Sequence, residues 1–374
     1  MARLLENVRI LDLSQYEAGP YATMLLADMG AEVIKIEPLW GEALRAAPPL
    51  IGGESAFFMF YNRNKKGMAL NLKDPRGVEI FKELVRHADV VFENFTPGVM
   101  DNLGIGYETL KEIKPDLIFV SVSGFGQDGP YSKRPSFDLI AQAMSGIISL
   151  TGERIGQPVP VADYIGDSVP ALYATIAVLS ALYHRKVAGE GQRVDVAQVD
   201  TLFSILVSPT TFPANRRTAY GTVQSHPTVI YDMYRAMDGH VVICAPMGNI
   251  FDRLKKVLRM EDVDHEKVKQ WASERTVDEI VKTLVDAKVP VAPVLDIENS
   301  LENAHAKARE IVATVNHPQA GSVKMPNFPV KFSKTPVKIR SPSPSLGQHT
   351  EETLSSLLNY SKEQIARLRE ERII

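Results

Sequence analysis

The clearest candidates for a chemical role lie in the segment YIGDSVPALYATIAVLSALYHR, which spans residues 164–185. It places one carboxylate, Asp167, just before a run whose apolar pattern predicts a long helix. Aspartate or serine before a helix commonly caps it, so Asp167 and Ser168 both qualify as caps. If Ser168 caps the helix by itself, Asp167 is free for another role. The positive end of the helix dipole would keep its carboxylate ionised, as a nucleophile requires. Both interpretations are open, and Asp163 is the local competitor for the nucleophile.

Basic residues form a second candidate site. Three of them lie in NRNKKG and two in NLKDPRG, namely Arg63, Lys65, Lys66, Lys73 and Arg76. A charged window of this kind is usually a solvated loop. The alternative is a site for a ligand with several phosphates, held by lysine charges and arginine forks.

The composition sets the class of protein. The chain has 374 residues, of which 45% are hydrophobic and 23% charged, as in an ordinary globular protein of two domains or one large one. The net charge of −3 argues against broad binding to nucleic acid or to an anionic membrane. We find no signal peptide at the N-terminus and no run of about 18 apolar residues, so we expect no membrane span.

The single cysteine and the eight histidines give little sign of redox or metal chemistry. Cys244 lies in an apolar, strand-like run and is expected to be a packed thiol, which makes a cytoplasmic location the default. The histidines form no compact ligand pair, so we expect no metal site. His184 follows the apolar segment and reads as a helix-terminus cation.

The elements that must position these residues alternate between strands and helices. Strand patterns cover 8–14, 31–37, 89–95 and 116–124, and helix patterns lie between them at 20–30 and 77–88. This alternation predicts an α/β fold with a parallel, doubly wound sheet. We assign residues 1–205 to a large Rossmann-like domain that carries Asp167.

A smaller α+β domain is expected over 220–320. Its signals are a hairpin around Asp238-Gly239, a helical stretch from 249 to 286, and a strand within 289–296. Residues 206–219 and 321–348 are expected to be linkers, the second rich in Pro, Ser and Lys. Residues 349–374 are predicted to form a C-terminal helix that returns to the large domain.

A glycine pattern after the strand at 116–124 resembles a dinucleotide fingerprint. Gly124, Gly126 and Gly129 fit GxGxxG, but that pattern alone is a weak signal. No helix opens after it to hold a pyrophosphate, because Pro130 and Pro135 interrupt the chain. We therefore expect a glycine loop and no nicotinamide or flavin site.

Several stretches together resemble one family. In chain order they are LDLSQYEAGPYATMLLADMGAEVIKIE, NRNKKGMALNLKDPRG, VFENFTPGVM, LGIGYETL, SVSGFGQDGP, FDLIAQAMSG, IGDSVPALYATIAVLSALYHR, AGEGQRVDVA, VPVAPVL, PVKFSKTP and LGQHTEETL. The chain is identified from them as a member of the family III CoA-transferases, the group related to formyl-CoA and carnitine CoA-transferases. The stretches follow the family's order and spacing from the N-terminus nearly to the C-terminus.

The resemblance implies a role for Asp167. In this family an aspartate lies fifteen residues before the leucine of an AL-x-x-R helix end, and counting back from Leu182 gives Asp167 and not Asp163. The aspartate attacks an acyl-CoA thioester and gives a mixed anhydride and CoA thiolate. An aspartyl-CoA thioester then forms, and CoA finally passes to an acceptor acid. No cofactor beyond CoA is implied.

The resemblance also implies contacts with CoA. Matching positions are Glu17, Ala18, Leu70, Asn71, Leu72, Lys73, Asn94, Phe95 and Thr96. Glu17 replaces a family glutamine, Lys73 is our first choice for a phosphate, and Phe95 for adenine. Pro38 stands where formyl-CoA transferase has an arginine, and Lys35 and Arg45 are weaker substitutes. A family acidic residue aligns with Asp138, which otherwise reads as a helix cap.

The family's assembly and chemistry imply three further expectations. Two subunits are expected to form an interlocked homodimer, and the loop at 124–129 is expected to exclude water in place of the family's glycine-rich covering loop. Small dicarboxylates are plausible acids, with Arg216, Arg217 or Arg235 pairing the second carboxylate. The rival activity is an α-methylacyl-CoA racemase, which needs a histidine base in the stretch that reads Pro135-Ser136-Phe137-Asp138 here.

Overall fold

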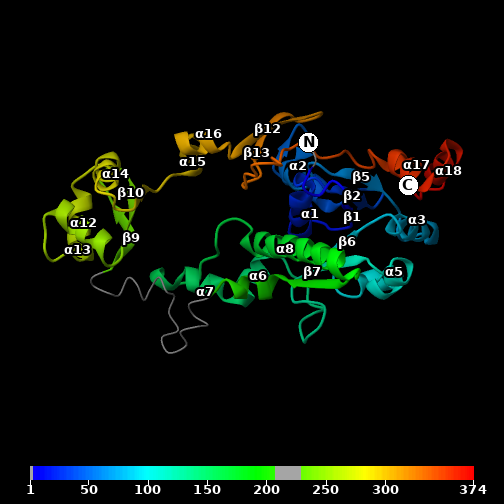
Figure 1. Ribbon diagram of the computed structural model, residues 1–374, viewed down its shortest axis with the longest axis horizontal. Helices are drawn as coiled ribbons and strands as arrows, with labels where there is room; N and C mark the ends of the chain where they lie inside the picture. The colour runs from blue at the N-terminus through cyan, green and yellow to red at the C-terminus, as the bar shows by residue number, and fades with distance from the viewer. Residues whose placement is uncertain (1–2, 207–228) are drawn as a thin grey trace. The chain divides into compact units, whose positions relative to one another are not determined.

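The computed structural model describes residues 3–206 and 229–374, which divide into two compact units (Figure 1). The first, unit 1, comprises the chain to residue 153, residues 157–205 and residues 310–374, so it contains both ends of the described chain. The second, unit 2, comprises 154–156 and the described part of 206–309. The sequence analysis placed the small domain at 220–320, about ten residues further along the chain.

A six-stranded parallel sheet organises unit 1, as predicted. Its strands lie in the order β5 (Lys66–Ala69), β2 (Glu32–Glu37), β1 (Arg9–Asp12), β6 (Val90–Glu93), β7 (Ile118–Ser123) and β8 (Arg193–Ala197). From β1 the chain proceeds outward through β2 and β5, and then from β6 outward on the other side. The strand order therefore reverses between β1 and β6, where open α/β sheets bind their ligands.

Helices cover both faces of the sheet (Figure 1). On one face lie α1 (Ala18–Asp28) and α8 (Ile165–Ala188). On the other lie α3 (Pro75–Val85), α5 (Tyr107–Ile113), α17 (Thr350–Leu358) and α18 (Lys362–Glu370). Successive strand residues face opposite ways, so Ile10 packs in the first layer and Leu11 in the second. Because both faces are covered, the strands read as continuous apolar runs.

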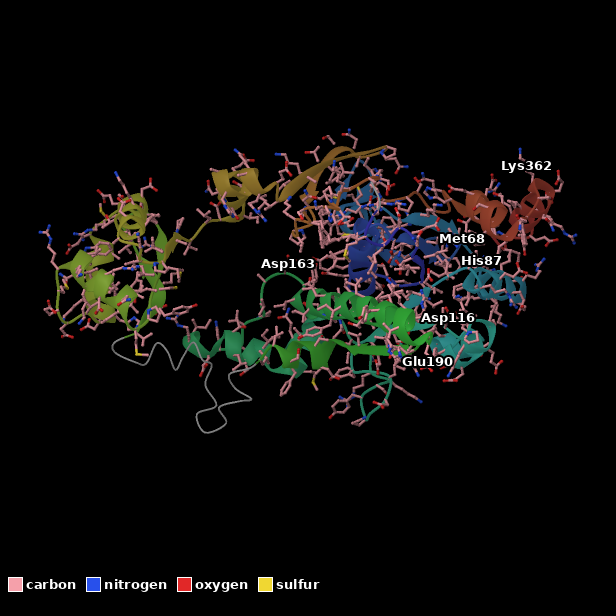
Figure 2. All side chains as sticks on the ribbon, viewed as in Figure 1. Met68, His87, Asp116, Asp163, Glu190 and Lys362 are labelled. Carbon is pink, nitrogen blue, oxygen red and sulfur yellow. The ribbon has the colours of Figure 1, made fainter. Side chains whose placement is uncertain are left out.

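Helix α8 begins earlier than the sequence suggested. It starts at Ile165, its N-cap residue is Tyr164 without a side-chain cap, and Asp167 lies in its first turn. The prediction that Asp167 or Ser168 caps this helix is therefore wrong. Figure 2 shows Asp163 in the loop that enters α8 and Glu190 just beyond its far end.

Helix α8 is also long and apolar enough to cross a membrane by length and composition. It packs against α1 and the sheet through small buried side chains such as Ala171, Ala174 and Val178. Because 39% of its apolar window is buried, one side of α8 packs inward and the other side is exposed in the single chain.

Shorter elements complete unit 1. The helices are α2 (Ala56–Tyr61), α4 (Val99–Asn102), α6 (Asp138–Ser145), α7 (Ile147–Thr151) and α9 (Gln198–Ser204), with a 3-10 turn at Ala43–Ala46. A second 3-10 turn, Glu153–Ile155, begins in unit 1 and continues into residues 154–156 of unit 2. Two hairpins pair β3 (Leu50–Ile51) with β4 (Glu54–Ser55) and β12 (Val312–His317) with β13 (Gly321–Pro326).

The C-terminal segment forms two helices where one was predicted. Asn359 adopts a left-handed conformation and ends α17. Ser361 then begins α18 through a reciprocal capping box with Gln364. The S-x-x-Q pattern was visible in the sequence and could have located this break.

Unit 2 contains an antiparallel sheet in the order β11 (Val291–Pro293), β10 (His240–Ala245) and β9 (Ile230–Arg235). The pairing of β9 with β10 is the predicted hairpin around Asp238-Gly239. Its helices are α12 (Asn249–Leu258), α13 (His265–Ser273), α14 (Val277–Asp286), α15 (Ile297–Glu302) and α16 (Ala304–Arg309). Cys244 lies half-buried in β10.

Candidate active site

The carboxyl ends of β1 and β6 open onto two cavities within unit 1. One, of about 250 Å³, is lined by polar residues that include Gln15, Asn94, Thr96, Ser123 and Gln198. The other, of about 460 Å³, has a more apolar wall that includes Leu44, Pro48, Phe57, Leu139 and Tyr164. Four residues line both cavities, namely Tyr16, Glu17, Phe137 and Asp167. The sheet thus brings Asp167 to the point where its strand order reverses.

Asp167 is a buried carboxylate with one side-chain partner. It is 9% exposed, and the Gln198 amide donates a hydrogen bond to its Oδ1. Burial raises the pKa of Asp167 to about 7, the neighbouring Asp138 carboxylate adds to the rise, and the Gln198 bond opposes it. Since Gln198 begins α9 directly after β8, the edge of the sheet fixes the orientation of this carboxylate.

Asp138 holds the start of α8 in place. Its Oδ1 accepts the backbone N–H of Gly166 at 2.6 Å, and the Gln142 amide donates to both of its oxygens at 3.1 and 3.0 Å. A Cβ on Gly166 would lie 2.5 Å from the Asp138 carbonyl oxygen, so only glycine permits this approach. Asp138 is not the cap of its own helix, whose N-cap residue is Phe137. Its carboxylate instead accepts the orphan N–H of Gly166 in the first turn of α8.

Glu17 is the second buried carboxyl beside the nucleophile candidate. It is 6% exposed at the start of α1, and its Oε1 accepts a hydrogen bond from the Ser168 hydroxyl at 3.2 Å. Burial raises the pKa of Glu17 to about 8, and the charge of Asp167 adds to the rise. The Tyr61 phenol is hydrogen bonded to the same carboxyl and opposes the shift.

The turn that carries Glu17 and Ala18 is fastened from two sides. The Asn94 amide brackets the backbone of Gln15, accepting its N–H at 2.8 Å and donating to its carbonyl at 2.7 Å. Glu42 accepts the N–H of Tyr16 at 2.8 Å, which holds Tyr16 at a φ of 61°. Residues other than glycine rarely adopt this left-handed backbone conformation, and those that do are often found at functional sites.

Phe95 and Thr96 continue from Asn94 along the polar cavity. Both line it, and the backbone N–H of Phe95 donates to the buried Glu93 carboxylate at 2.7 Å. Ala18 lines the same cavity. The predicted group of Glu17, Ala18 and residues 94–96 therefore lines one cavity, which Asp167 also lines.

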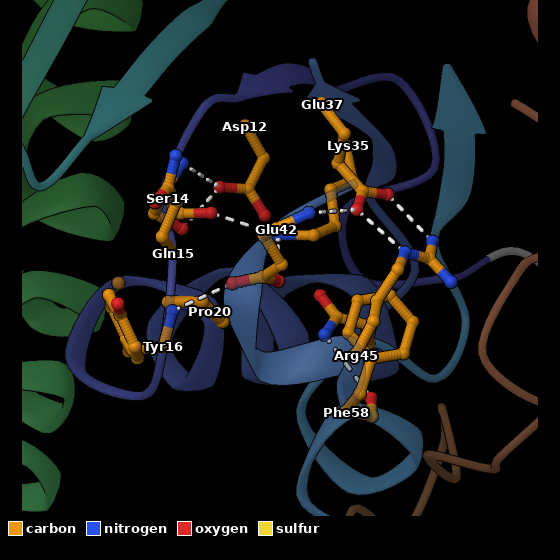
Figure 3. A network of polar contacts seen from close by, with 12 residues as sticks. Asp12, Ser14, Gln15, Tyr16, Pro20, Lys35, Glu37, Glu42, Arg45 and Phe58 are labelled. Carbon is orange, nitrogen blue, oxygen red and sulfur yellow. Dashed lines mark hydrogen bonds and ion pairs between the residues drawn. The ribbon is translucent and has the colours of Figure 1, made fainter. Parts of the chain in front are cut away.

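Lys35 and Arg45 lie in an internal network under that turn (Figure 3). Lys35 is fully buried, and its ammonium pairs with Glu42 at 2.7 Å and donates to the Ser14 carbonyl at 2.8 Å. Arg45 makes a two-point contact with Glu37 at 2.7 and 2.7 Å. Their charges are satisfied inside the protein, so neither is free to replace the arginine missing at position 38.

The basic window at 63–66 is also committed to internal pairs. Arg63 pairs with Asp28 at 2.7 Å and Lys65 with Asp12 at 2.9 Å, and all four side chains are at most 1% exposed. Lys66 bridges Glu32 and Glu352 at 2.7 and 2.8 Å. Neither a solvated loop nor a phosphate site describes these residues, because a buried cation requires a partner of opposite charge.

The segment 70–73 leaves β5 at the same edge of the sheet. Leu70 is buried, and Asn71 donates through its backbone N–H to the Ile373 carbonyl at 2.8 Å. Leu72 is half-buried and Lys73 exposed. The Lys73 ammonium lies 5.5 Å from the ring of Trp40, a side chain that is 71% exposed and that the sequence analysis did not single out. Together they offer a cation and an aromatic surface to solvent.

The loop after β7 has no dinucleotide architecture. Gly126 and Gly129 have φ values of 84° and 87°, and the next helix starts only at Asp138. No helix begins directly after the glycines, so the predicted glycine loop is confirmed. Gly124 lines the polar cavity, and a Cβ there would lie 2.2 Å from Ser136.

Neither cavity has a lysine, arginine or histidine among its lining residues in the described chain. Arg216 and Arg217, suggested for a second carboxylate, lie outside the described residues, and Arg235 belongs to β9 of unit 2. Within residues 3–206 and 229–374 no three His, Cys, Asp or Glu side chains gather in a way that holds a metal ion.

Comparison with known proteins identifies the family of this chain. Residues 5–350 match the model of CoA-transferase family III. The chain is 36% identical to a succinyl-CoA:mesaconate CoA-transferase of Haloarcula marismortui, covering 94% of this chain and 95% of that protein. It is 34% identical to a succinyl-CoA:glutarate CoA-transferase of Mus musculus, with 97% and 88% covered. A crystal structure of a CAIB/BAIF family protein from Brucella suis has a TM-score of 0.83 at 28% identity, covering 96% and 100%.

The chain therefore belongs to CoA-transferase family III, as the sequence motifs indicated. It is an enzyme of the CoA-transferase class. The cavities at the carboxyl edge of the sheet, with Asp167 between them, are its candidate active site.

Proposed function

We propose that this enzyme transfers CoA from an acyl-CoA, with succinyl-CoA as donor, to a carboxylic acid acceptor, and that Asp167 is the nucleophile. The observation that carries the proposal is a buried carboxylate, oriented by Gln198, that faces two cavities at once. A transferase needs this arrangement, because CoA and the acid must both reach one reacting atom.

The proposed chemistry has four balanced steps. The Asp167 carboxylate attacks the thioester carbonyl, the C–S bond breaks, and a mixed anhydride and CoA thiolate result. The thiolate attacks the Asp167 carbonyl of the anhydride and releases the donor acid as its carboxylate, which leaves an aspartyl-CoA thioester. The acceptor carboxylate attacks that thioester and forms a second anhydride and free thiolate. The thiolate then attacks the acyl carbonyl of the acceptor and restores the Asp167 carboxylate.

The two cavities fit the two parts of the substrate. We place the thioester end of CoA in the polar cavity near Asn94 and Thr96, with the nucleotide toward Lys73 and Trp40 at the neighbouring strand ends. A basic side chain beside an exposed ring suits a phosphorylated purine. The acid occupies the apolar cavity. Mesaconate and glutarate, named for the relatives, are the first acceptors to test.

Intact-protein mass spectrometry after incubation with succinyl-CoA tests the nucleophile. We expect a CoA-sized adduct on the wild type, lost on treatment with hydroxylamine in favour of a hydroxamate at Asp167. The Asp167→Asn protein should show neither. Asp163→Asn is the matched control, because Asp163 is an exposed carboxylate four residues away with a φ of 62° that asparagine tolerates.

The rival activity predicts a different result. A racemase moves a proton at the carbon beside the thioester and needs a base on each face. No histidine is among the lining residues of either cavity within the described chain, which favours the transferase. Exchange of deuterium at that carbon without any adduct would refute the transfer mechanism.

We also propose that two copies of the chain assemble as an interlocked homodimer in the cytoplasm. One side of α8 carries apolar side chains that are 40–71% exposed in the single chain, namely Leu172, Tyr173, Ile176, Tyr183 and Val187. An apolar stripe of this length is costly in water and is normally covered by a partner. Light scattering at several protein concentrations would give the mass, and a concentration-independent monomer would refute the assembly.

A further inference from the structure

Glu17 and Asp167 are two carboxyls that face the same two cavities without a cation between them. Both are at least nine-tenths buried, and both line each cavity. The two residues are also linked indirectly, because the hydroxyl of Ser168, the residue after Asp167, donates a hydrogen bond to Glu17 Oε1 at 3.2 Å. Two carboxylates in such a low-dielectric site repel each other, so the pair retains one proton near neutral pH.

The surroundings of Glu17 favour its keeping that proton. The titratable groups that face it are Tyr61 from α2, Tyr21 from α1, Asp163 from the loop before α8, and Asp167 from α8. Two of them are acidic, and the other two are phenols that are neutral at pH 7. None can balance a negative charge on Glu17, whereas the Tyr61 and Ser168 hydroxyls can share hydrogen bonds with either form.

Asp167 has the opposite requirement. As a nucleophile it must be ionised, and it has a firm amide donor in Gln198 on one oxygen. Both carboxyls lie at a helix N-terminus, Glu17 at the N-cap of α1 and Asp167 in the first turn of α8, so it is the Gln198 donor that distinguishes Asp167. The two carboxyls therefore have environments suited to different protonation states, which is how paired acids commonly divide their roles in active sites.

We infer that Glu17 works as a neutral carboxylic acid whose O–H donates a hydrogen bond to the acyl oxygen of the bound substrate. This inference rests on the transferase function proposed above. When Asp167 attacks the thioester, the carbonyl oxygen becomes an oxyanion, and the Glu17 hydroxyl strengthens its hydrogen bond to it. The oxyanion collapses, the C–S bond breaks, and CoA leaves as the thiolate while Glu17 keeps its proton throughout. The same donor serves each later attack, so no proton enters or leaves the enzyme.

The position of Glu17 explains why an acid can stand where the family has an amide. A glutamine supplies an N–H donor, and a protonated glutamate supplies an O–H donor at the same place. The neutral acid donates the stronger bond to an oxyanion, but only while it stays protonated. Alkaline pH thus removes the donor and adds a charge that repels the acceptor carboxylate.

The pH dependence of adduct formation in three proteins tests this role. In the wild type, the rate constant at saturating succinyl-CoA should fall above about pH 8, with the loss of one proton. Glu17→Gln keeps a neutral donor and should retain adduct formation at neutral pH but lose the alkaline fall. Glu17→Ala has no donor, so it should be slower than the wild type by about 100- to 1,000-fold at pH 7 and should show no alkaline fall. Glu370→Gln, an exposed glutamate on α18, is the control and should behave as the wild type.

Infrared difference spectroscopy gives a readout that does not depend on turnover. In the wild type the carbonyl band of protonated carboxylic acids should lose intensity between pH 7 and pH 10, and the loss should be smaller in Glu17→Gln, where Asp167 and Glu93, each with a pKa raised to about 7, still contribute. If Glu17→Gln keeps the alkaline fall, or is as slow as Glu17→Ala at every pH, the neutral-donor role is wrong. If the wild type forms no adduct at any pH, the transferase mechanism itself is wrong, which separates the two failures.

Discussion

Replacing Gln198 by leucine removes the one amide that supports the charge of Asp167 while keeping a side chain of similar length. Gln198 donates to Asp167 Oδ1, and no other hydrogen bond to either oxygen of this carboxylate occurs in the described residues. A hydrogen bond to an ionised group contributes about 1.5–3 kcal/mol. Because one pKa unit corresponds to about 1.36 kcal/mol, its loss should raise the pKa of Asp167 by about one to two units.

The consequence is a loss of nucleophile at neutral pH. With a pKa of about 7, Asp167 is about half ionised at pH 7. A rise of about one to two units leaves about one tenth to one hundredth ionised, so adduct formation at pH 7 should slow by about 5- to 50-fold. The direction of the change follows from the chemistry, because the carboxylate is active only above its pKa. Raising that pKa moves the low-pH fall in the rate of adduct formation (the acid limb) to higher pH and leaves the plateau rate unchanged.

The assay is the rate of adduct formation between pH 5.5 and pH 10, measured in the Glu17→Gln background so that no alkaline fall obscures the plateau. Thr201→Val is the matched control, because Thr201 lies one turn further along α9 and bonds only backbone carbonyls of its own turn. An acid limb that stays in place in Gln198→Leu, or that moves to lower pH, would refute the assigned role of this amide.

Three further substitutions test other parts of the structure. Gly166→Ala places a Cβ against the Asp138 backbone, so adduct formation should fall at least about 100-fold with little change in succinyl-CoA affinity; an unchanged rate would contradict the contact. Lys65→Met leaves Asp12 buried without its partner and should lower the free energy of unfolding by about 3–5 kcal/mol; an unchanged denaturation midpoint would contradict the pairing. Lys73→Ala should raise the KM for acyl-CoA about threefold to tenfold with kcat unchanged, and a change in kcat alone would contradict a binding role.

Local patterns in the sequence were sufficient for the architecture. Apolar runs at 8–14, 31–37, 89–95 and 116–124 became adjacent parallel strands, because strands covered on both faces need no polar alternation. The Asp238-Gly239 turn and the small domain's hairpin followed from turn chemistry. The first residue of α8 could not be predicted from local patterns, because a helix that lacks a side-chain cap gives no local start signal.

The site could be located only in part. Family spacing selected Asp167, and the motifs brought together Glu17, Ala18 and residues 94–96. Partnerships across the fold were not readable: Gln198 reaches Asp167 from 31 residues away, and Asp138 supports a helix that starts 27 residues later. Both interpretations of the basic residues 63–66 were wrong for the same reason, because nothing near Lys65 in the sequence identifies Asp12 as its partner.

At the carboxyl edge, the residues that stabilise the fold are separate from the residues that line the cavity proposed for the acid. The buried pairs beneath the edge, such as Lys35 with Glu42, lie in the scaffold, whereas the apolar cavity is lined by residues outside the sheet, such as Leu44, Pro48 and Leu139. If the acid occupies this cavity as proposed, exchanging those side chains should redirect the enzyme to bulkier or smaller acids without changing the sheet. Variant libraries restricted to these cavity-lining residues are therefore an economical way to evolve a new acceptor specificity, because the sheet beneath them stays unchanged.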